Sequence, residues 1–292
     1  MKKVLLASTA LVLSAGVAAA DVAVSGDGRM GVANNFTGDL VFSSRIRIAF
    51  SASGETDGGL SFGGSIRADN AGGGEGGTAG SVFIEGAFGK LSMGDVDSAA
   101  EAAVGDVSGV GYQLAGRQES IYIGGPATAA LYEYSAGDLS VYLGAGQQET
   151  GNDSVSVGLA YSFGNFGVSA GYETNDSVGA APDTATNVDH IILGATAAFG
   201  DATLKVIHGM ADFDGGDADQ TAVSLDYVMG ATTITAMYYD ESEFGALGSG
   251  EGFGLGVAYD LGGGATLKAG YISDETDGAT EDGFDLGINM SF

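Results

Sequence analysis

The 292-residue chain has no cysteine, only two prolines (Pro126 and Pro182) and only two histidines (His190 and His208). Without cysteine there is no disulfide framework, so an exported chain of this kind must be stabilised by a large core or a closed sheet. Two histidines so far apart in the pattern do not support a histidine metal site or a catalytic triad. After residue 20 no run of 18 apolar residues occurs. This excludes a membrane-spanning helix, but not a barrel of short membrane strands.

Basic residues are scarce too, and two of the ten, Lys2 and Lys3, lie in a segment with the features of a secretory signal peptide. A mostly apolar stretch at residues 4–17 precedes three alanines, so we expect cleavage after residue 20. The mature chain, residues 21–292, then has eight cationic residues against 38 acidic ones, a net charge of −30. It lacks the basic surface that phosphate contacts require, so nucleic-acid binding is not expected.

Apolar residues alternate with small or polar residues in sixteen segments of the mature chain, from residues 22–33 to residues 282–292. Successive side chains of a strand lie on opposite faces, so each segment would have one oily and one wet face. Most segments have roughly the 9–11 residues that a tilted membrane strand needs. The pattern predicts an all-β fold: a single transmembrane antiparallel β-barrel of 16 strands over residues 21–292.

Two kinds of connection alternate between these segments. Very short turns contain glycine, as at Phe163-Gly164-Asn165, and the others are longer and rich in Asp, Glu and Gly, as at residues 174–186. In outer-membrane barrels the short turns are periplasmic and the long loops are external. Residues 96–128 form the longest loop, and a loop of that length in a compact fold is usually functional.

Five segments occur in order along the mature chain that are similar to segments of a known family: Ser25-Gly26-Asp27-Gly28-Arg29-Met30-Gly31-Val32, Phe42-Ser43-Ser44-Arg45-Ile46-Arg47, Gly86-Ala87-Phe88-Gly89-Lys90-Leu91-Ser92-Met93-Gly94-Asp95, Tyr132-Glu133-Tyr134-Ser135-Ala136-Gly137 and Tyr259-Asp260-Leu261-Gly262-Gly263-Gly264. In these segments the chain resembles the general diffusion porins of alphaproteobacteria. The resemblance implies a homotrimeric porin in the outer membrane of a Gram-negative bacterium. Its water-filled channel passes ions and small hydrophilic solutes by passive diffusion.

The resemblance further implies that the third external loop folds inward and narrows the pore. In this chain that constriction loop is residues 96–128. It also implies that the terminal aromatic, Phe292, completes the strand that closes the barrel and is read by the barrel insertion machinery. No cofactor or enzymatic activity is expected for such a channel.

The cationic residues cluster on the first three predicted strands, where period two places Arg29, Arg45, Arg47 and Arg67 on the polar face. The alternative face would expose arginine to lipid, at a cost of about 2–4 kcal/mol at the bilayer midplane. We expect these four to form a basic wall of the pore. Lys205 and Lys268 also fall at inward positions and would extend the basic side.

The loop that would face this wall carries four acidic residues, Asp95, Asp97, Glu101 and Asp106. A positive wall opposite a negative loop would create a transverse field at the narrowest point and help to pin the loop. The alternative is that the arginines are solvated or paired for stability.

The densest acidic cluster elsewhere is Asp212, Asp214, Asp217 and Asp219, and its carboxylates are candidate Ca²⁺ ligands. A solvated acidic surface is the alternative. Two other functions stay open on the sequence: a secreted, calcium-binding Gly/Asp-rich β-roll, although strict nonapeptide repeats are missing, and an outer-membrane channel specific for one sugar or acid. An enzymatic barrel is less well supported, because no His/Ser/Asp set occurs in a plausible order.

Overall fold

The computed structural model describes residues 21–34, 36, 38–69, 76–77, 80–114, 129–146, 152–177, 187–213, 216–241, 249–276 and 278–292. These residues are almost all in strands, with one short helix. The elements are β1 (Asp21–Asn34), β2 (Val41–Glu55), β3 (Ser61–Asp69), β4 (Gly76–Gly77), β5 (Ser81–Gly86), β6 (Gly89–Gly94), α1 (Ala99–Val104), β7 (Ala129–Ala136), β8 (Leu139–Gly146), β9 (Asn152–Phe163), β10 (Phe166–Ser177), β11 (Asn187–Phe199), β12 (Ala202–Phe213), β13 (Gly216–Met229), β14 (Thr232–Glu241), β15 (Gly250–Gly262), β16 (Ala265–Thr276) and β17 (Ala279–Ser291).

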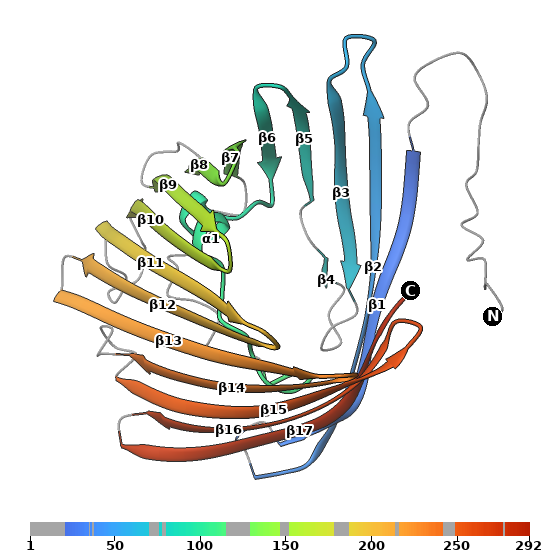
Figure 1. Ribbon diagram of the computed structural model, residues 1–292, viewed down its shortest axis with the longest axis vertical. Helices are drawn as coiled ribbons and strands as arrows, with labels where there is room; N and C mark the ends of the chain where they lie inside the picture. The colour runs from blue at the N-terminus through green and yellow to red at the C-terminus, as the bar shows by residue number, and fades with distance from the viewer. Residues whose placement is uncertain are drawn as a thin grey trace.

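The strands form one closed antiparallel barrel (Figure 1). Apart from the short β4, each strand pairs with the next, and β17 pairs with β1, so the ring of described strands is closed. β4 has two residues and pairs with β3, which leaves a ring of sixteen strands within the described ranges. The predicted 16-stranded barrel is therefore confirmed, and the β-roll alternative is excluded. Among the described residues, no helix is long and apolar enough to cross a membrane.

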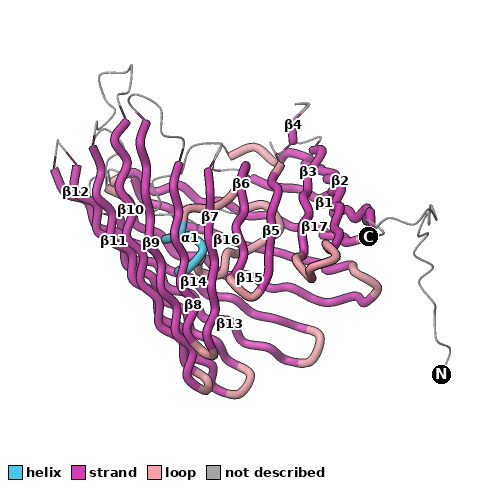
Figure 2. The backbone as a smooth tube through the Cα atoms, turned by 90° about the horizontal axis from the view of Figure 1, so that it is seen from above, coloured by secondary structure: helices cyan, strands magenta, loops and turns pink. Residues whose placement is uncertain are grey.

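Short turns gather at one end of the barrel (Figure 2). Gly164, Gly200 and Gly230 have φ of 61–62° in the tight turns after β9, β11 and β13. A left-handed residue lets the turn follow the twist of the paired strands, and glycine adopts it without steric cost. Aromatic rings cluster outside these turns, with Phe166 5.7 Å from Phe163 and 5.9 Å from Phe199 between ring centroids. Aromatic rings at this level are typical of the girdles of membrane barrels.

The two faces of each strand differ as predicted. On β15 the outward residues Phe253, Leu255, Val257 and Tyr259 are 43–55% exposed, although all are large and apolar. In water such a belt would be unfavourable, whereas in a bilayer it contacts lipid. The intervening inward positions carry glycine or alanine, and Gly252 and Gly254 are buried. Large apolar side chains therefore point outward, and small residues line the interior.

The chain ends at the seam where the barrel closes. Phe292 pairs with Gly26 of β1 through two backbone hydrogen bonds, Gly26 N–H to Phe292 O at 2.6 Å and Phe292 N–H to Gly26 O at 2.9 Å. The Phe292 ring lies over the outward side of Gly26 and Gly28, where a Cβ on Gly26 would come within 3.0 Å of it. The C-terminal residue thus extends the β1–β17 ladder by one pair.

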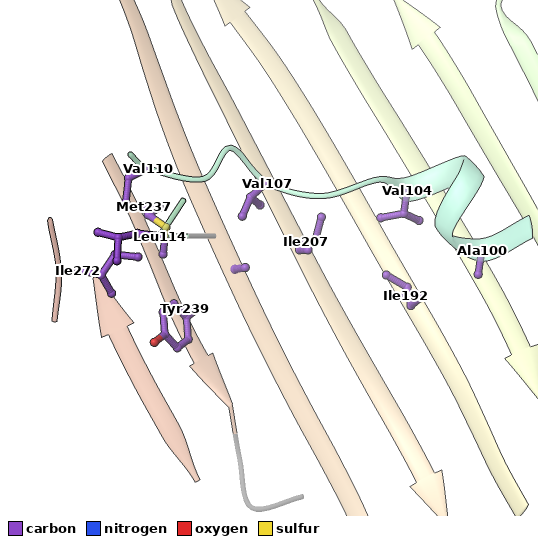
Figure 3. Packing of buried hydrophobic residues seen from close by; sticks show 11 residues of the cluster. Ala100, Val104, Val107, Val110, Leu114, Ile192, Ile207, Met237, Tyr239 and Ile272 are labelled. Atoms are coloured by element: carbon purple, nitrogen blue, oxygen red, sulfur yellow. The ribbon is translucent and has the colours of Figure 1, made fainter. Parts of the chain in front are cut away.

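After β6 the chain turns into the barrel, as predicted for the inward-folded loop. Ser98 caps α1 by accepting a hydrogen bond from Glu101 N–H at 3.1 Å. Residues 105–110 then continue along the inner wall without regular secondary structure, and the chain bends at residues 111–113. Figure 3 shows Val104, Val107 and Val110 pointing at the wall strands. They belong to one buried cluster. Its loop members are Ala100, Val104, Val107, Val110 and Leu114, and its wall members, from β11 to β16, are Ile192, Ile207, Ala222, Met237, Tyr239 and Ile272.

Glycines on the inner wall allow the loop to lie this close. A Cβ on Gly171 of β10 would be 2.6 Å from Ala100 Cα, and one on Gly256 of β15 would be 2.9 Å from Val110 Cβ. Real Cβ atoms essentially never come that near another atom, so only glycine leaves room for the loop backbone. We name this row of inward glycines the glycine track. It comprises Gly144, Gly158, Gly171, Gly194, Gly254, Gly256, Gly270, Gly287 and Gly31.

The first prediction concerns the seam. Deleting Phe292 removes two backbone hydrogen bonds, each worth about 1 kcal/mol, and the ring that covers Gly26. We expect less SDS-resistant folded barrel in unheated gel samples, while the channels that do form conduct normally. Phe199→Ala is the control, since Phe199 is a similarly exposed outward aromatic distant from the seam. A deletion variant that folds as well as this control would contradict the prediction.

The second prediction concerns the glycine track. Gly171→Ala should push α1 toward the lumen, lower the single-channel conductance and destabilise the protein by about 1–3 kcal/mol through overpacking. Gly167→Ala is the matched control, because it lies on the same face of β10 and a Cβ there has its nearest neighbour at 3.9 Å. Conductance and thermal unfolding of both variants test this. Equal behaviour of the two variants would show that the loop does not need the track.

Candidate pore constriction

The four predicted arginines come together on the inner wall of β1, β2 and β3. Arg29 is directly opposite Arg45 in the β1–β2 register, and directly opposite residues of an antiparallel pair share a face. Arg47 is opposite Asp27 on one side and Asp69 on the other. The neighbouring residues Phe42, Ile46 and Phe50 are exposed on the outer face. The barrel therefore places this basic wall, defined as Arg29, Arg45, Arg47 and Arg67, in the lumen.

Two carboxylates that the sequence reasoning missed are interleaved with the basic wall. Asp27 binds Arg45 with an Nη2–Oδ1 distance of 3.2 Å. Asp69 binds Arg67 at 2.7 Å and Arg47 at 3.2 Å. Both partners follow from period two, because Asp27 is two residues before Arg29 and Asp69 is two residues after Arg67. The wall thus contains four guanidinium groups and two carboxylates, and it keeps an excess of positive charge.

The four predicted acidic residues lie at two separate places in the barrel. Asp97, Glu101 and Asp106 lie close enough together in and around α1 for their charges to interact. Asp95 stays at the end of β6, where its charge acts on Arg67. Burial, followed by the charges of Asp97, Asp106 and Glu173, raises the pKa of Glu101 to about 7. The α1 group, meaning Asp97, Glu101 and Asp106, is therefore a dense anionic centre that gains charge near neutral pH.

The α1 group and the basic wall lie on opposite sides of the ring. α1 packs against β8, β9, β10 and β11. In the order of strands, β11 is eight strands from β2 in either direction, and β10 is eight from β1. α1 thus lies across the lumen from the arginines, inside the barrel (Figures 1 and 2). The topology provides two oppositely charged sides that face each other across the lumen.

Hydrogen bonds to wall residues hold the loop in addition to its apolar packing. Ala99 N–H donates to Ser156 Oγ at 2.8 Å, and Ser108 N–H donates to Ser224 Oγ at 3.0 Å. Lys205 Nζ donates to the carbonyl of Val104 at 2.8 Å, so this predicted lumen cation anchors the loop next to Asp106. The field was expected to help pin the loop. The contacts seen here hold the loop through apolar packing and hydrogen bonds, and a contribution of the field stays a prediction.

Asp285 of β17 is a further anchor that the sequence did not single out. Its Oδ2 atom accepts hydrogen bonds from three consecutive backbone N–H groups, those of Tyr112, Gln113 and Leu114, at 2.9, 2.7 and 3.0 Å. Asp285 is only 2% exposed. Its inward parity was visible in the sequence, but its partners lie more than 170 positions away in the chain, so only the fold identifies its role.

The remaining candidates are the lumen cation Lys268 and the acidic cluster at residues 212–219. Lys268 of β16 is opposite Gly287, on the inner face. Asp212 and Asp217 are opposite each other near the end of the β12–β13 hairpin, Asp219 lies further along β13, and Asp214 is outside the described residues. No group of three or more potential metal-ligating residues occurs in the described part of the chain. The Ca²⁺ site stays a prediction. Residues 115–128 of the predicted loop also lie outside the described residues.

Comparisons with known proteins agree with this architecture. A family model described as Gram-negative porin matches residues 7–279. A porin of Rhodobacter capsulatus is 36% identical over 308 residues, which cover 93% of this chain and 100% of the relative. A solved porin structure refined at 1.8 Å is similar with a TM-score of 0.80 and 30% identity, over 93% of this chain and 100% of that one. OmpT of Vibrio cholerae with loop L8 deleted, at 20% identity and a TM-score of 0.79 over 94% of this chain and 99% of that one, shares the fold.

The family match and the identity to the Rhodobacter capsulatus porin both extend over nearly the whole chain. They agree with the closed barrel, the lipid-compatible outer face and the inward loop described above. The chain therefore belongs to the Gram-negative porins, and it is an outer-membrane β-barrel channel for diffusion.

Proposed function

We propose that this porin passes ions and small hydrophilic solutes without an energy source, through a constriction with a transverse electric field. The positive side of the field is the basic wall, and the negative side is the α1 group. The observation that supports this most directly is the placement of α1 against β8–β11, opposite β1–β3 in the ring. No cofactor and no catalytic residue enters the proposal, since width and field suffice to select solutes.

Distance and salt decide how far such a field reaches. At physiological ionic strength, charges in water are screened within about 8 Å. Charges at the wide mouths of the barrel therefore have little influence on a solute on the axis. Charges at the narrowest level act on it from both sides at once. The acidic composition of the whole chain therefore matters less than the residues at the constriction.

We also propose that the native protein is a homotrimer. Support comes from the outer face of β2, β3, β5 and β6, which has an apolar hollow of about 840 Å³. Its lining includes the exposed side chains of Phe50, Phe62 and Ile66, together with Gly64. A hollow of this kind is suited to receive bulky side chains of a neighbouring barrel, whereas a smooth apolar face is sufficient for lipid.

The basic wall generates a prediction on selectivity. Arg45→Ala/Arg47→Ala should shift the reversal potential in a salt gradient toward cation selectivity, because the positive side loses two guanidinium groups. It should also raise the single-channel conductance, because the side chains that occupy the lumen become shorter. Lys90→Ala is the control, since it removes a cation that is paired with Glu133 and lies on β6, a strand that carries none of the four arginines. If both quantities are unchanged in the double variant, the basic wall plays no part in permeation.

Glu101 generates a prediction on pH. Its pKa of about 7 means that it becomes charged as the pH rises from 6 to 8. The negative side of the constriction therefore strengthens, and cation preference should increase over this range. Reversal potentials at pH 6, 7 and 8 measure the change. Glu101→Gln should remove this step and leave the pore functional, whereas an identical pH profile in the variant would assign the step to another group.

A further inference from the structure

The turn formed by residues 111–114, which we name the clasp turn, binds a carboxylate of the barrel wall, that of Asp285, through its backbone N–H groups. Three consecutive N–H groups converge on one oxygen of Asp285, at 2.7–3.0 Å. Successive backbone N–H groups that point into one concavity bind anions well, and hydrogen bonds to an ionised acceptor are stronger than neutral ones. The carboxylate is almost fully buried, so water competes little for these donors.

Gly111 allows the clasp turn to form. It has φ of +78°, which side chains other than glycine rarely adopt, and a Cβ there would lie only 2.7 Å from Asp285 Cγ. Gly270 of β16 faces the same glycine, since its own Cβ would be 2.6 Å from Gly111 Cα. Backbone conformation and space both require glycine at position 111. A substitution here would therefore separate the turn from Asp285 without changing any charge.

The clasp turn then contacts the basic wall directly. The carbonyl of Tyr112 accepts a hydrogen bond from Arg29 Nη1 at 3.3 Å, and Arg29 Cζ is 6.0 Å from the centre of the Tyr112 ring. The ring itself rests on two glycines of the track, Gly287 of β17 and Gly31 of β1. The Ser43 hydroxyl of β2 donates a hydrogen bond to the side-chain carbonyl of Gln113. The turn thus crosses the seam between the last strand and the first two.

We propose that Asp285 and Gly111 are positioning residues for pore selectivity, because together they fix the clasp turn that holds Arg29 in its lumen orientation. The inference rests on the proposed function, in which Arg29 is part of the positive side of the constriction. Its chain of contacts runs from Asp285 to the three N–H groups, then through Tyr112 to the Arg29 guanidinium. When the turn is released, Arg29 loses its carbonyl acceptor. It then moves toward the Asp27 carboxylate on its own strand, whose charge already acts on it.

The test uses the full-length mature protein in planar bilayers with a salt gradient, and it compares four single variants and one double variant with the wild type. Gly111→Ala releases the turn without a charge change, and Asp285→Asn keeps the side-chain shape but weakens the anion site. Arg29→Ala removes the residue that is positioned. Gly230→Ala is the control, because it imposes a similar backbone strain at φ +61° in a short turn with nothing within 4 Å of the added Cβ.

We expect Gly111→Ala and Asp285→Asn to raise open-channel current noise several-fold. We also expect them to shift the reversal potential toward cation selectivity, in the same direction as Arg29→Ala and by a smaller amount. Gly230→Ala should match the wild type. In an Arg29→Ala background, Gly111→Ala should add noise but no further shift in reversal potential, because the shift acts through Arg29. Such a double-mutant comparison isolates the coupling between the two positions.

Three results would overturn the inference. The first is a wild-type reversal potential in both clasp variants. The second is an undiminished shift from Gly111→Ala in the Arg29→Ala background. The third is that neither clasp variant folds into a channel, which would make the clasp turn necessary for the barrel itself. A wild-type protein that forms no ion-conducting channel would instead refute the proposed function.

Discussion

The constraint on which this structure depends is that backbone N–H and C=O groups in a bilayer need partners within the protein. A sheet meets it only when it closes, and here β17 pairs with β1 and Phe292 adds the last pair. Closure fixes the register of the ring. Register in turn fixes which residues face lipid and which face the lumen, because the side-chain period is two. The basic wall, the glycine track and the anchor at Asp285 are all consequences of that single alternation.

The constriction loop uses this interior in two ways. Its small and apolar side chains, such as Ala100 and Val110, pack on wall positions kept free by glycine. Its acidic side chains lie around α1, opposite the arginines. Apolar packing and hydrogen bonds to wall residues such as Ser156, Ser224 and Asp285 therefore hold the loop, and the acidic side chains around α1 place negative charge on that side of the lumen. An arrangement held by ion pairs across the lumen would neutralise the field and block the path that the field is meant to control.

Much of this could be predicted from the sequence, because alternation is a local signal. Strand faces, glycine turns, the lumen positions of Arg45 and Arg47, and the inward loop all follow from period two, spacing and family resemblance. The features that could not be predicted from the sequence depend on pairs of residues that are distant in the chain. The hydrogen bonds to Asp285 and the packing of Val110 on Gly256 depend on how the loop lies along β15–β17. Asp95 was grouped with Asp97 because the two are only two residues apart in the sequence. Asp95 directly follows β6, where its N–H still bonds to the Gly80 carbonyl, and its charge acts on Arg67.

The central claim is that opposite sides of the lumen attract opposite ions at the level of the loop. Anomalous diffraction from crystals of the protein soaked in rubidium bromide tests it most directly, because it locates both ions in one experiment. The account predicts bromide beside Arg45 and Arg47 on β2, and rubidium beside Asp97, Glu101 and Asp106 on the far side. Bromide and rubidium on the same side, or both spread evenly around the axis, would contradict it.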